Sequence, residues 1–311
     1  MVYIKLEDDM YKFIDNKYEK IPEILKKIIY KLKYKNKNFI SKKVQNGEYI
    51  VLPNVNKRLL GNLKKLSNIR CWKNICVSNN LMENYEFMNF ANENLLNVMD
   101  GKWLLKNIVD QIVEYIADSR KEAINTYEVS ILCNKLDDTI IEKIKEICQK
   151  VKMCNIITNN CKQYIKLEEE MYKEKGMALN ISNNYKKATE KSIIVINFDF
   201  DNRQIQNCIL SSNSYIINVN KNLEKNGFDG KNLISYKMNL PEKYSEYEKI
   251  FENFDTNTLY ESFIYKHTNY NNIKKELVSD EVKIVYLKDS NDKIIKNLED
   301  NLSKKLDKIK I

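Results

Sequence analysis

Polar and basic side chains follow several short apolar segments in the second half of the chain, and their donor groups suit an anion. Ammonium, amide and hydroxyl groups bind phosphate and carboxylate oxygens. Asparagine also caps helices and forms turns, so turn formation is the alternative interpretation. The pattern therefore predicts either a small-anion site or a set of structural turns. The residues are Asn134, Lys135, Thr158, Asn159, Asn160, Ser182, Asn183, Asn184, Lys186 and Lys187.

Two carboxylates, Asp199 and Asp201, end the apolar segment 192–198 and are the best acidic candidates. A pair of acids at a strand end could hold a divalent metal together with water and substrate oxygens. The favoured interpretation is structural: Asp201 caps a helix that begins near Asn202, and Asp199 orients a loop. We therefore expect no metal site.

The rarity of some residue types excludes several reaction classes. The single histidine, His267, excludes sites that need two histidines, and we expect it to be exposed on a helix. The chain also lacks a G-x-x-x-x-G-K-[ST] phosphate loop and a nucleophile elbow. Its seven cysteines include no C-x-x-C pair, which favours reduced thiols and a cytoplasmic location over a disulfide framework or a zinc ribbon.

Dinucleotide binding makes a sharper demand on the sequence. The first turn of a dinucleotide-binding sheet brings its backbone against the pyrophosphate, and glycines make room for it. Here residues 134–138 read NKLDD, without a glycine. Thr158 and Asn159 stand where an acid would bind the ribose hydroxyls. We therefore expect no cofactor, with NAD or NADP kept as the less favoured alternative.

Five short apolar segments indicate the sheet that would position these residues. They span 128–133, 155–158, 178–182, 192–198 and 215–219, with helices predicted over 139–151 and 162–175, the latter ended by Gly176. Strands that are apolar on both faces and joined by long crossovers are typical of a doubly wound parallel sheet. Ligands of such sheets bind in the crevice at the strands' carboxyl ends, where the candidate residues fall.

The remainder of the chain predicts a smaller first domain and a returning C-terminus. Strands are expected over 48–53 and 74–78, with a helix over 56–67 between them. An amphipathic helix over 102–119 connects the domains, and a helix over 247–266 and an edge strand over 282–287 follow the sheet. The predicted domains are an N-terminal α/β domain with the connecting helix (1–122), a Rossmann-like domain without the glycine-rich fingerprint (123–245), and C-terminal helices packing back on the first (246–311). The predicted fold class is α/β.

This order of parts, with Asp100-Gly101 opening the connecting helix, resembles the amino-acid-dehydrogenase-like Rossmann families of the shikimate-dehydrogenase type. The resemblance covers residues 48–270. It implies a Rossmann fold, a bound dinucleotide and an oxidoreductase, and the missing glycines make the chain a degenerate member.

Charge and amphipathic segments bear on partners. The formal charge is +9, but only four basic residues are arginines, so nucleic acid is not expected. No apolar run reaches the roughly 18 residues of a membrane span. A basic amphipathic helix over 22–35 could lie on an anionic membrane surface, although we expect its apolar stripe to pack on its own domain. A lysine-rich helix over 293–311 either packs back or joins two copies of the chain.

Taken together, these patterns predict a non-catalytic or regulatory protein that binds a small anionic ligand or a protein partner at the strand-end crevice. The alternative is an enzyme, oxidoreductase-like in architecture, acting on a small acidic or phosphorylated substrate, with Lys186, Lys187 and Asp199 at the mouth of the cleft. A nucleic-acid-associated protein is the second alternative.

Overall fold

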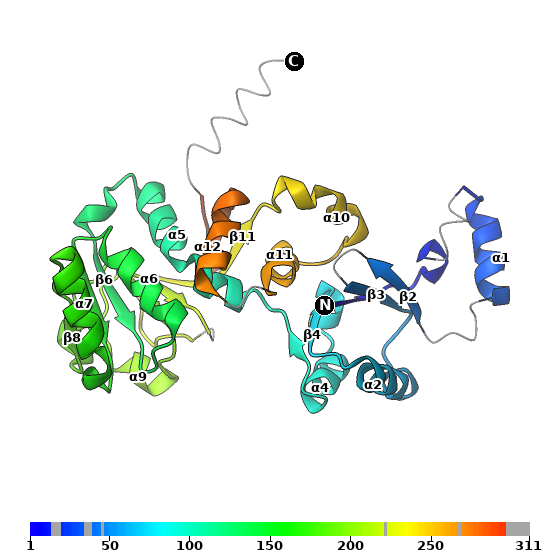
Figure 1. The fold of residues 1–311 in the computed structure, drawn as a ribbon, viewed down its shortest axis with the longest axis horizontal. Coiled ribbons are helices and arrows are strands. Elements are labelled where there is room, and N and C mark those ends of the chain that lie inside the picture. The colour runs from blue at the N-terminus through cyan, green and yellow to red at the C-terminus, as the bar shows by residue number, and fades with distance from the viewer. Residues whose placement is uncertain (14–19, 34–38, 45–46, 221–222, 267–268, 297–311) are drawn as a thin grey trace, which may run out of the picture. The chain divides into compact units, whose positions relative to one another are not determined.

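The computed structural model describes residues 1–13, 20–33, 39–44, 47–220, 223–266 and 269–296. The chain divides into two compact units, one of residues 1–101 and 242–266 and the other of residues 102–241 and 267 onward (Figure 1). It therefore passes from one unit to the other three times. None of the helices in the described ranges combines the length and the apolar composition of a membrane-spanning segment.

The first unit is built on a five-stranded sheet in the order β2-β3-β1-β4-β5. β2 is antiparallel to β3, and the other neighbours are parallel. The N-terminal residues, for which no strand was predicted, form the central strand, because their alternate side chains enter the cores on both faces. The strands are β1 (Val2–Leu6), β2 (Ile40–Val44), β3 (Gly47–Leu52), β4 (Asn74–Val77) and β5 (Asn97–Val98).

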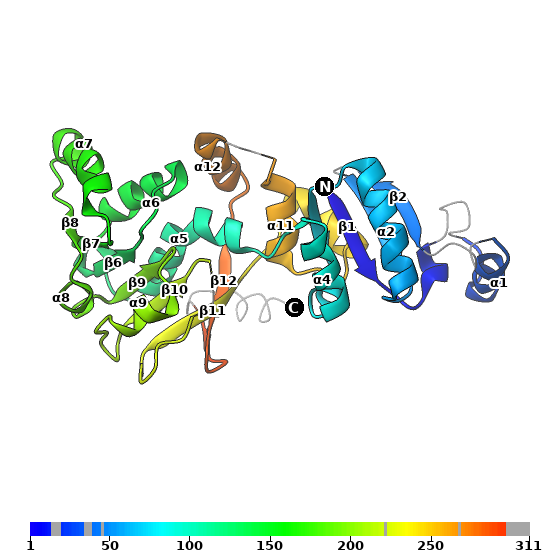
Figure 2. The same ribbon diagram turned by 90° about the horizontal axis from the view of Figure 1, so that it is seen from below.

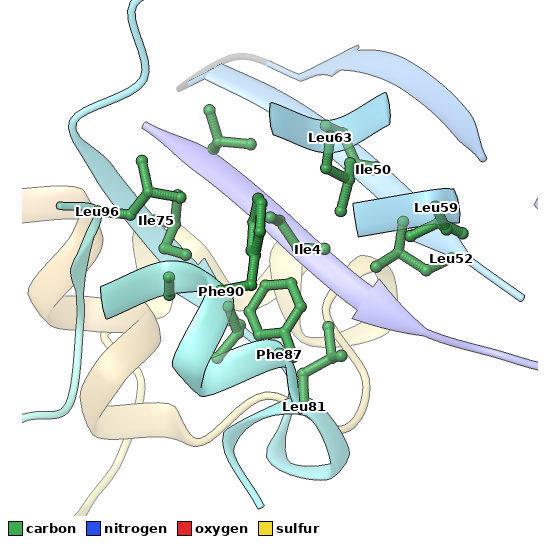
Figure 3. Packing of buried hydrophobic residues seen from close by; sticks show 13 residues of the cluster. Ile4, Ile50, Leu52, Leu59, Leu63, Ile75, Leu81, Phe87, Phe90 and Leu96 are labelled. Carbon is green, nitrogen blue, oxygen red and sulfur yellow. The ribbon is translucent and has the colours of Figure 1, made fainter. Parts of the chain in front are cut away.

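One face of this sheet packs on α2 (Lys57–Arg70) and α4 (Tyr85–Glu93), with α3 (Asn79–Met82) between them in the chain. Figure 3 shows the side chains that meet there, with the Phe87 and Phe90 rings of α4 tilted against each other beside the central strand. The strands and the helix predicted for this region are present within three residues of their expected ends. The core includes Ile4, Ile50, Leu52, Leu63, Ile75, Phe87 and Phe90.

The opposite face packs on α10 (Ser245–Ile250) and α11 (Thr256–Ile264). The ring centroids of Tyr3 and Phe251 are 4.5 Å apart, and the Cys76 thiol donates to the Thr258 carbonyl at 3.7 Å. The single helix predicted over 247–266 is therefore wrong. The chain turns through a left-handed Asn253, and Asp255 then caps a new helix.

The second unit contains an eight-stranded sheet in the described part of the chain, in the order β13-β12-β11-β10-β9-β6-β7-β8 (Figure 2). β6 to β11 are parallel, and β12 and β13 are antiparallel. The strands are β6 (Glu128–Leu132), β7 (Met153–Ile157), β8 (Asn180–Ser182), β9 (Ile194–Asn197), β10 (Tyr215–Asn218), β11 (Lys231–Met238), β12 (Ile284–Asp289) and β13 (Ile294–Ile295).

Numbered from β6, the parallel strands follow the order 3-2-1-4-5-6, which is that of a doubly wound Rossmann sheet. The predicted α/β class and the five parallel segments are confirmed. Strands β7 and β8 are added on one side of β6, and β9, β10 and β11 on the other, so the strand order reverses between β6 and β9. The turns after β6 and β9 therefore meet at this topological switch point. The helices of this unit are α5 (Lys102–Arg120), α6 (Asp138–Cys148), α7 (Ile165–Lys175), α8 (Tyr185–Thr189), α9 (Asn202–Gln206) and α12 (Tyr270–Ser279).

The boundaries of the two units differ from the predicted domain boundaries both before and after this sheet in the sequence. Helix α5 belongs to the second unit, where Lys143 of α6 donates to Asp110 at 2.6 Å and to Glu146 at 2.8 Å. Burial alone would raise the pKa of Glu146, but hydrogen bonds from Lys143, Lys274 and Tyr270 lower it to about 2. Of the C-terminal stretch, only the part up to residue 266 belongs to the first unit.

The strands are not apolar throughout, which corrects the prediction. A row of buried asparagine side chains crosses three neighbouring strands: Asn197 donates to Asn218 at 3.0 Å, and Asn218 donates to Asn232 at 2.9 Å. Ser130 and Asn155 are also buried on β6 and β7. Such groups are tolerated in a core because each finds a partner.

Helix α1 (Glu23–Lys33) forms where the basic amphipathic helix was predicted, but its apolar stripe does not pack on its own domain. Ile24 is 74% exposed and Leu32 is 80% exposed. That expectation is therefore wrong. The helix predicted from residue 293 is contradicted at β13, while its part over 297–311 and His267 lie outside the described residues. All seven cysteines are free.

Candidate functional site

The first turn of the Rossmann-like sheet is closed by a carboxylate of the chain itself. The backbone N–H groups of Asn134 and Lys135 donate to the two oxygens of Asp199, at 2.7 and 2.8 Å. Asp199 follows β9, which neighbours β6 across the switch point. The amides that would face a pyrophosphate thus face Asp199 instead. The prediction that Asp199 orients a loop is confirmed.

Neighbouring side chains hold the same turn from other directions. The Asn134 side chain accepts from the backbone N–H of Asn159 at 2.9 Å, and Gln163 donates to the Asn134 carbonyl at 2.5 Å. The buried Tyr164 hydroxyl donates to the Cys133 carbonyl at 2.6 Å. Burial raises the pKa of the Cys133 thiol to about 12, so it stays protonated and is not a nucleophile at neutral pH.

The N-terminus of α6, which follows this turn, is also supplied with negative charge. Asp137 caps the helix by accepting from the Ile140 N–H at 2.9 Å, and it forms an ion pair with Lys106. Asp138 adds a second carboxylate in the first turn. Since a helix N-terminus attracts anions through its free N–H groups and dipole, these two carboxylates stabilise the end of α6 that would otherwise attract an anion.

Asp201 has the capping role predicted for it. Its carboxylate accepts from the Gln204 N–H at 2.9 Å, and the Gln204 side chain accepts from the Asp201 N–H at 3.0 Å, which completes a capping box on α9. Asp199 and Asp201 therefore serve different segments. In the described portion of the chain, no group of three or more His, Cys, Asp or Glu side chains could hold a metal ion.

The polar residues after β7 mainly form turns. Buried Thr158 accepts from the Asn160 N–H at 3.1 Å, and the Asn159 side chain accepts from the Tyr185 hydroxyl. These contacts correspond to the turn interpretation of the sequence pattern.

The residues after β8 instead border a cavity of about 620 Å³ on the face of the sheet that carries α8. Ser182, Asn184 and Lys187 line it, and all three were among the predicted site residues. The cavity exists because the crossover from β8 to β9 contains only the five-residue α8, too short to cover this face of the strands. Asn184 caps α8, accepting from the Lys187 N–H at 3.2 Å.

Part of the cavity wall was missed from the sequence. Asn155 and Asn180 form its floor, joined by a hydrogen bond of 2.6 Å between their side chains. Glu128, Glu190 and Lys191 add charge at the rim. The signal lay in polar residues at alternate positions of β6 (Glu128 and Ser130) and β8 (Asn180 and Ser182), which a fully covered parallel strand would not carry.

A second hollow, of about 440 Å³, adjoins the same helix. It is lined by Asn183, Asn184, Tyr185, Lys186 and Asn207. The residues predicted for one strand-end crevice therefore lie in two places: a closed turn around Asn134 and Asp199, and open space around α8. The larger cavity extends along the sheet face to Glu128 and Met153, the first residues of β6 and β7, so it is not confined to the carboxyl ends of the strands where the site was predicted.

Fold and site together define a Rossmann-like α/β protein whose first turn is filled by its own carboxylate. No protein-family model matches the chain, and no curated protein matches it. Among solved structures it is similar to L-tryptophan dehydrogenase from Nostoc punctiforme, at 11% identity over 90% of this chain and 87% of that one, with a TM-score of 0.30. D-mandelate dehydrogenase from Rhodotorula graminis is similar at 7% identity over 69% and 72%, with a TM-score of 0.30. Because these scores are low, the fold assignment depends on the strand order alone.

Proposed function

We propose that this chain is a non-catalytic binding protein that uses a Rossmann-like scaffold without a dinucleotide and takes a small anionic ligand in the cavity beside α8. The observation that carries the proposal is the contact of Asp199 with the Asn134 and Lys135 amides. A dinucleotide would have to displace a carboxylate held by two charge-assisted hydrogen bonds, and would then meet Asp137 and Asp138. Among the residues that the structure describes, no carboxylate is bound in this way by the lysines that line the cavity beside α8.

The cavity wall supports an anion that also carries hydroxyl or ammonium groups. Lys187 and Lys191 are exposed at its rim, and within the described residues neither forms an ion pair. Amide groups of Asn155 and Asn180 offer donors and acceptors below them. Glu190 at the same rim would accept hydrogen bonds from the ligand's donors. A volume of about 620 Å³ is within the range of small-molecule sites.

Thermal-shift measurements on the full chain test both halves of the proposal. NAD and NADP at about 1 mM should leave the melting temperature unchanged, whereas glucose 6-phosphate or citrate at the same concentration should raise it. The rise should be lost in a Lys187→Ala/Lys191→Ala variant and kept in the matched control Lys173→Ala, which removes an exposed lysine from α7. Stabilisation by NAD or NADP would overturn the proposal, as would a response to these anions that the double variant retains.

A further inference from the structure

Helix α1 has its apolar and basic side chains segregated in a way that the proposed ligand site does not use. At about 100° per residue, Ile24, Leu25, Ile28 and Leu32 fall in one stripe along the helix. Lys31 and Lys27 lie along one edge of this stripe, whereas Lys26 lies near the opposite side of the helix. The helix therefore has an apolar face bordered on one edge by positive charge.

Contacts with the first unit are made by the other side of α1. The Tyr11 hydroxyl of η1 (Met10–Phe13) donates to the Glu23 carboxylate at 3.5 Å, and the Lys27 ammonium lies 4.9 Å from the centre of the Tyr11 ring. Glu23, the single acid of the helix, is about 155° around from the centre of the apolar stripe. In both ribbon views α1 lies away from α2 and α4, which cover the sheet (Figures 1 and 2).

The stripe is open to solvent along its length. Ile24, Leu25, Ile28 and Leu32 are all exposed. Elsewhere in the first unit, exposed apolar residues such as Ile69 and Leu95 do not form a row on one helix face. Four large aliphatic side chains exposed in one row are unfavourable in water, and a row of this kind is typical of a surface that binds another apolar surface.

Charge decides which occupant fits. An anionic lipid surface offers hydrocarbon at the depth of the stripe and phosphate or carboxylate groups at the level of the bordering lysines. A second copy of the chain would bring its own α1 lysines against these, with the same charge, in a symmetric pairing. We propose that α1 is a docking helix that lies on anionic membranes, with Ile24, Leu25, Ile28 and Leu32 toward the acyl chains.

Vesicle co-sedimentation of the full chain tests the proposal. The protein should bind phosphatidylcholine vesicles that contain about 30 mol% phosphatidylserine, and binding to pure phosphatidylcholine should be about tenfold weaker or less. A Leu25→Ser/Leu32→Ser variant should lose about tenfold or more in binding, since two apolar anchors are removed. Ile69→Ser is the matched control, because Ile69 is 79% exposed, like Leu32, but lies on α2, and it should bind as the wild type does.

A second variant separates charge from the apolar stripe. Lys27→Gln/Lys31→Gln should weaken binding to the anionic vesicles and remove most of its salt dependence, whereas Lys166→Gln/Lys173→Gln on α7 should not. Circular dichroism and melting curves verify that each variant is folded. The proposal is overturned if the wild type ignores anionic vesicles or if the Leu25→Ser/Leu32→Ser variant binds them equally well. It is also overturned if light scattering shows that this variant turns a dimer into a monomer without any vesicle binding.

Discussion

Replacing Asp199 by alanine should destabilise the second unit and free the first turn of its sheet. The carboxylate accepts two backbone hydrogen bonds of 2.7 and 2.8 Å, and bonds to a charged acceptor are worth about 1.5–3 kcal/mol each. Asp199 is only partly buried, so water can replace part of this. We therefore expect a loss of about 2 kcal/mol in the free energy of unfolding.

Urea denaturation and amide hydrogen exchange measure this loss. Trp103 lies in the first turn of α5 in the second unit, so a Trp72→Phe background lets its fluorescence follow that unit alone. Exchange at the Asn134 and Lys135 amides should accelerate by about tenfold or more in Asp199→Ala. Asp229→Asn, which changes an exposed acid, is the control.

Added anion provides an independent check on the same turn. Sulfate at about 50 mM should restore part of the stability of Asp199→Ala by binding the vacated amides, with little effect on the wild type beyond its general salt effect. The reasoning is refuted if the variant unfolds within about 0.5 kcal/mol of the wild type and both amides keep their protection.

Four other changes have direct readouts. Asn218→Ala interrupts the asparagine row and should cost about 2–3 kcal/mol in urea unfolding, because its neighbours' amides lose buried partners. Glu146→Gln should make the stability less dependent on acid pH. The lowered pKa of Glu146 contributes about 3 kcal/mol to the free energy of unfolding at pH values above 4.5, and this contribution is lost as the pH falls toward 2. Urea unfolding at pH 6 and at pH 3 measures the difference. Gly230→Ala should lower the melting temperature, since its Cβ would lie 2.5 Å from the Ser214 carbonyl oxygen. Cys71→Ser should remove the fastest thiol in a native-state thiol titration, because Cys71 is the exposed cysteine.

The elements that could be predicted are those whose pattern is local. The strands of the second sheet are short apolar runs, and the helix that ends at Gly176 stops where glycine adopts left-handed backbone, with φ of 64°. β11 was missed because Lys231–Met238 mixes polar and apolar residues without clean alternation, and its pairing with β12 shifts register twice. The break before α11 depends on Asn253, whose left-handed φ an apolar periodicity cannot reveal.

The site was predictable only in its parts. The sequence indicated Asn134, Lys135 and Asp199 separately, but about 65 residues separate the acid from the amides, and only the pairing of β6 with β9 brings them together. The cavity beside α8 depends on how much of the sheet face a five-residue helix covers, and this cannot be predicted from the types of the residues. Composition likewise indicated an amphipathic α1, whereas the outward direction of its stripe follows from the contact of Tyr11 with Glu23 on the opposite side.

The order of the elements in the chain affects how the first unit folds while the protein is being synthesised. Its sheet is complete by residue 98, but α10 and α11 follow only after residue 242. At about 5–20 residues per second, the ribosome finishes these helices on the order of ten seconds after the sheet. During that time the side of the sheet with Tyr3, Tyr49 and Cys76 remains uncovered, so a nascent chain exposes aromatic surface to its neighbours. Any fragment that stops before residue 242 would keep that surface open permanently and should precipitate unless a chaperone holds it.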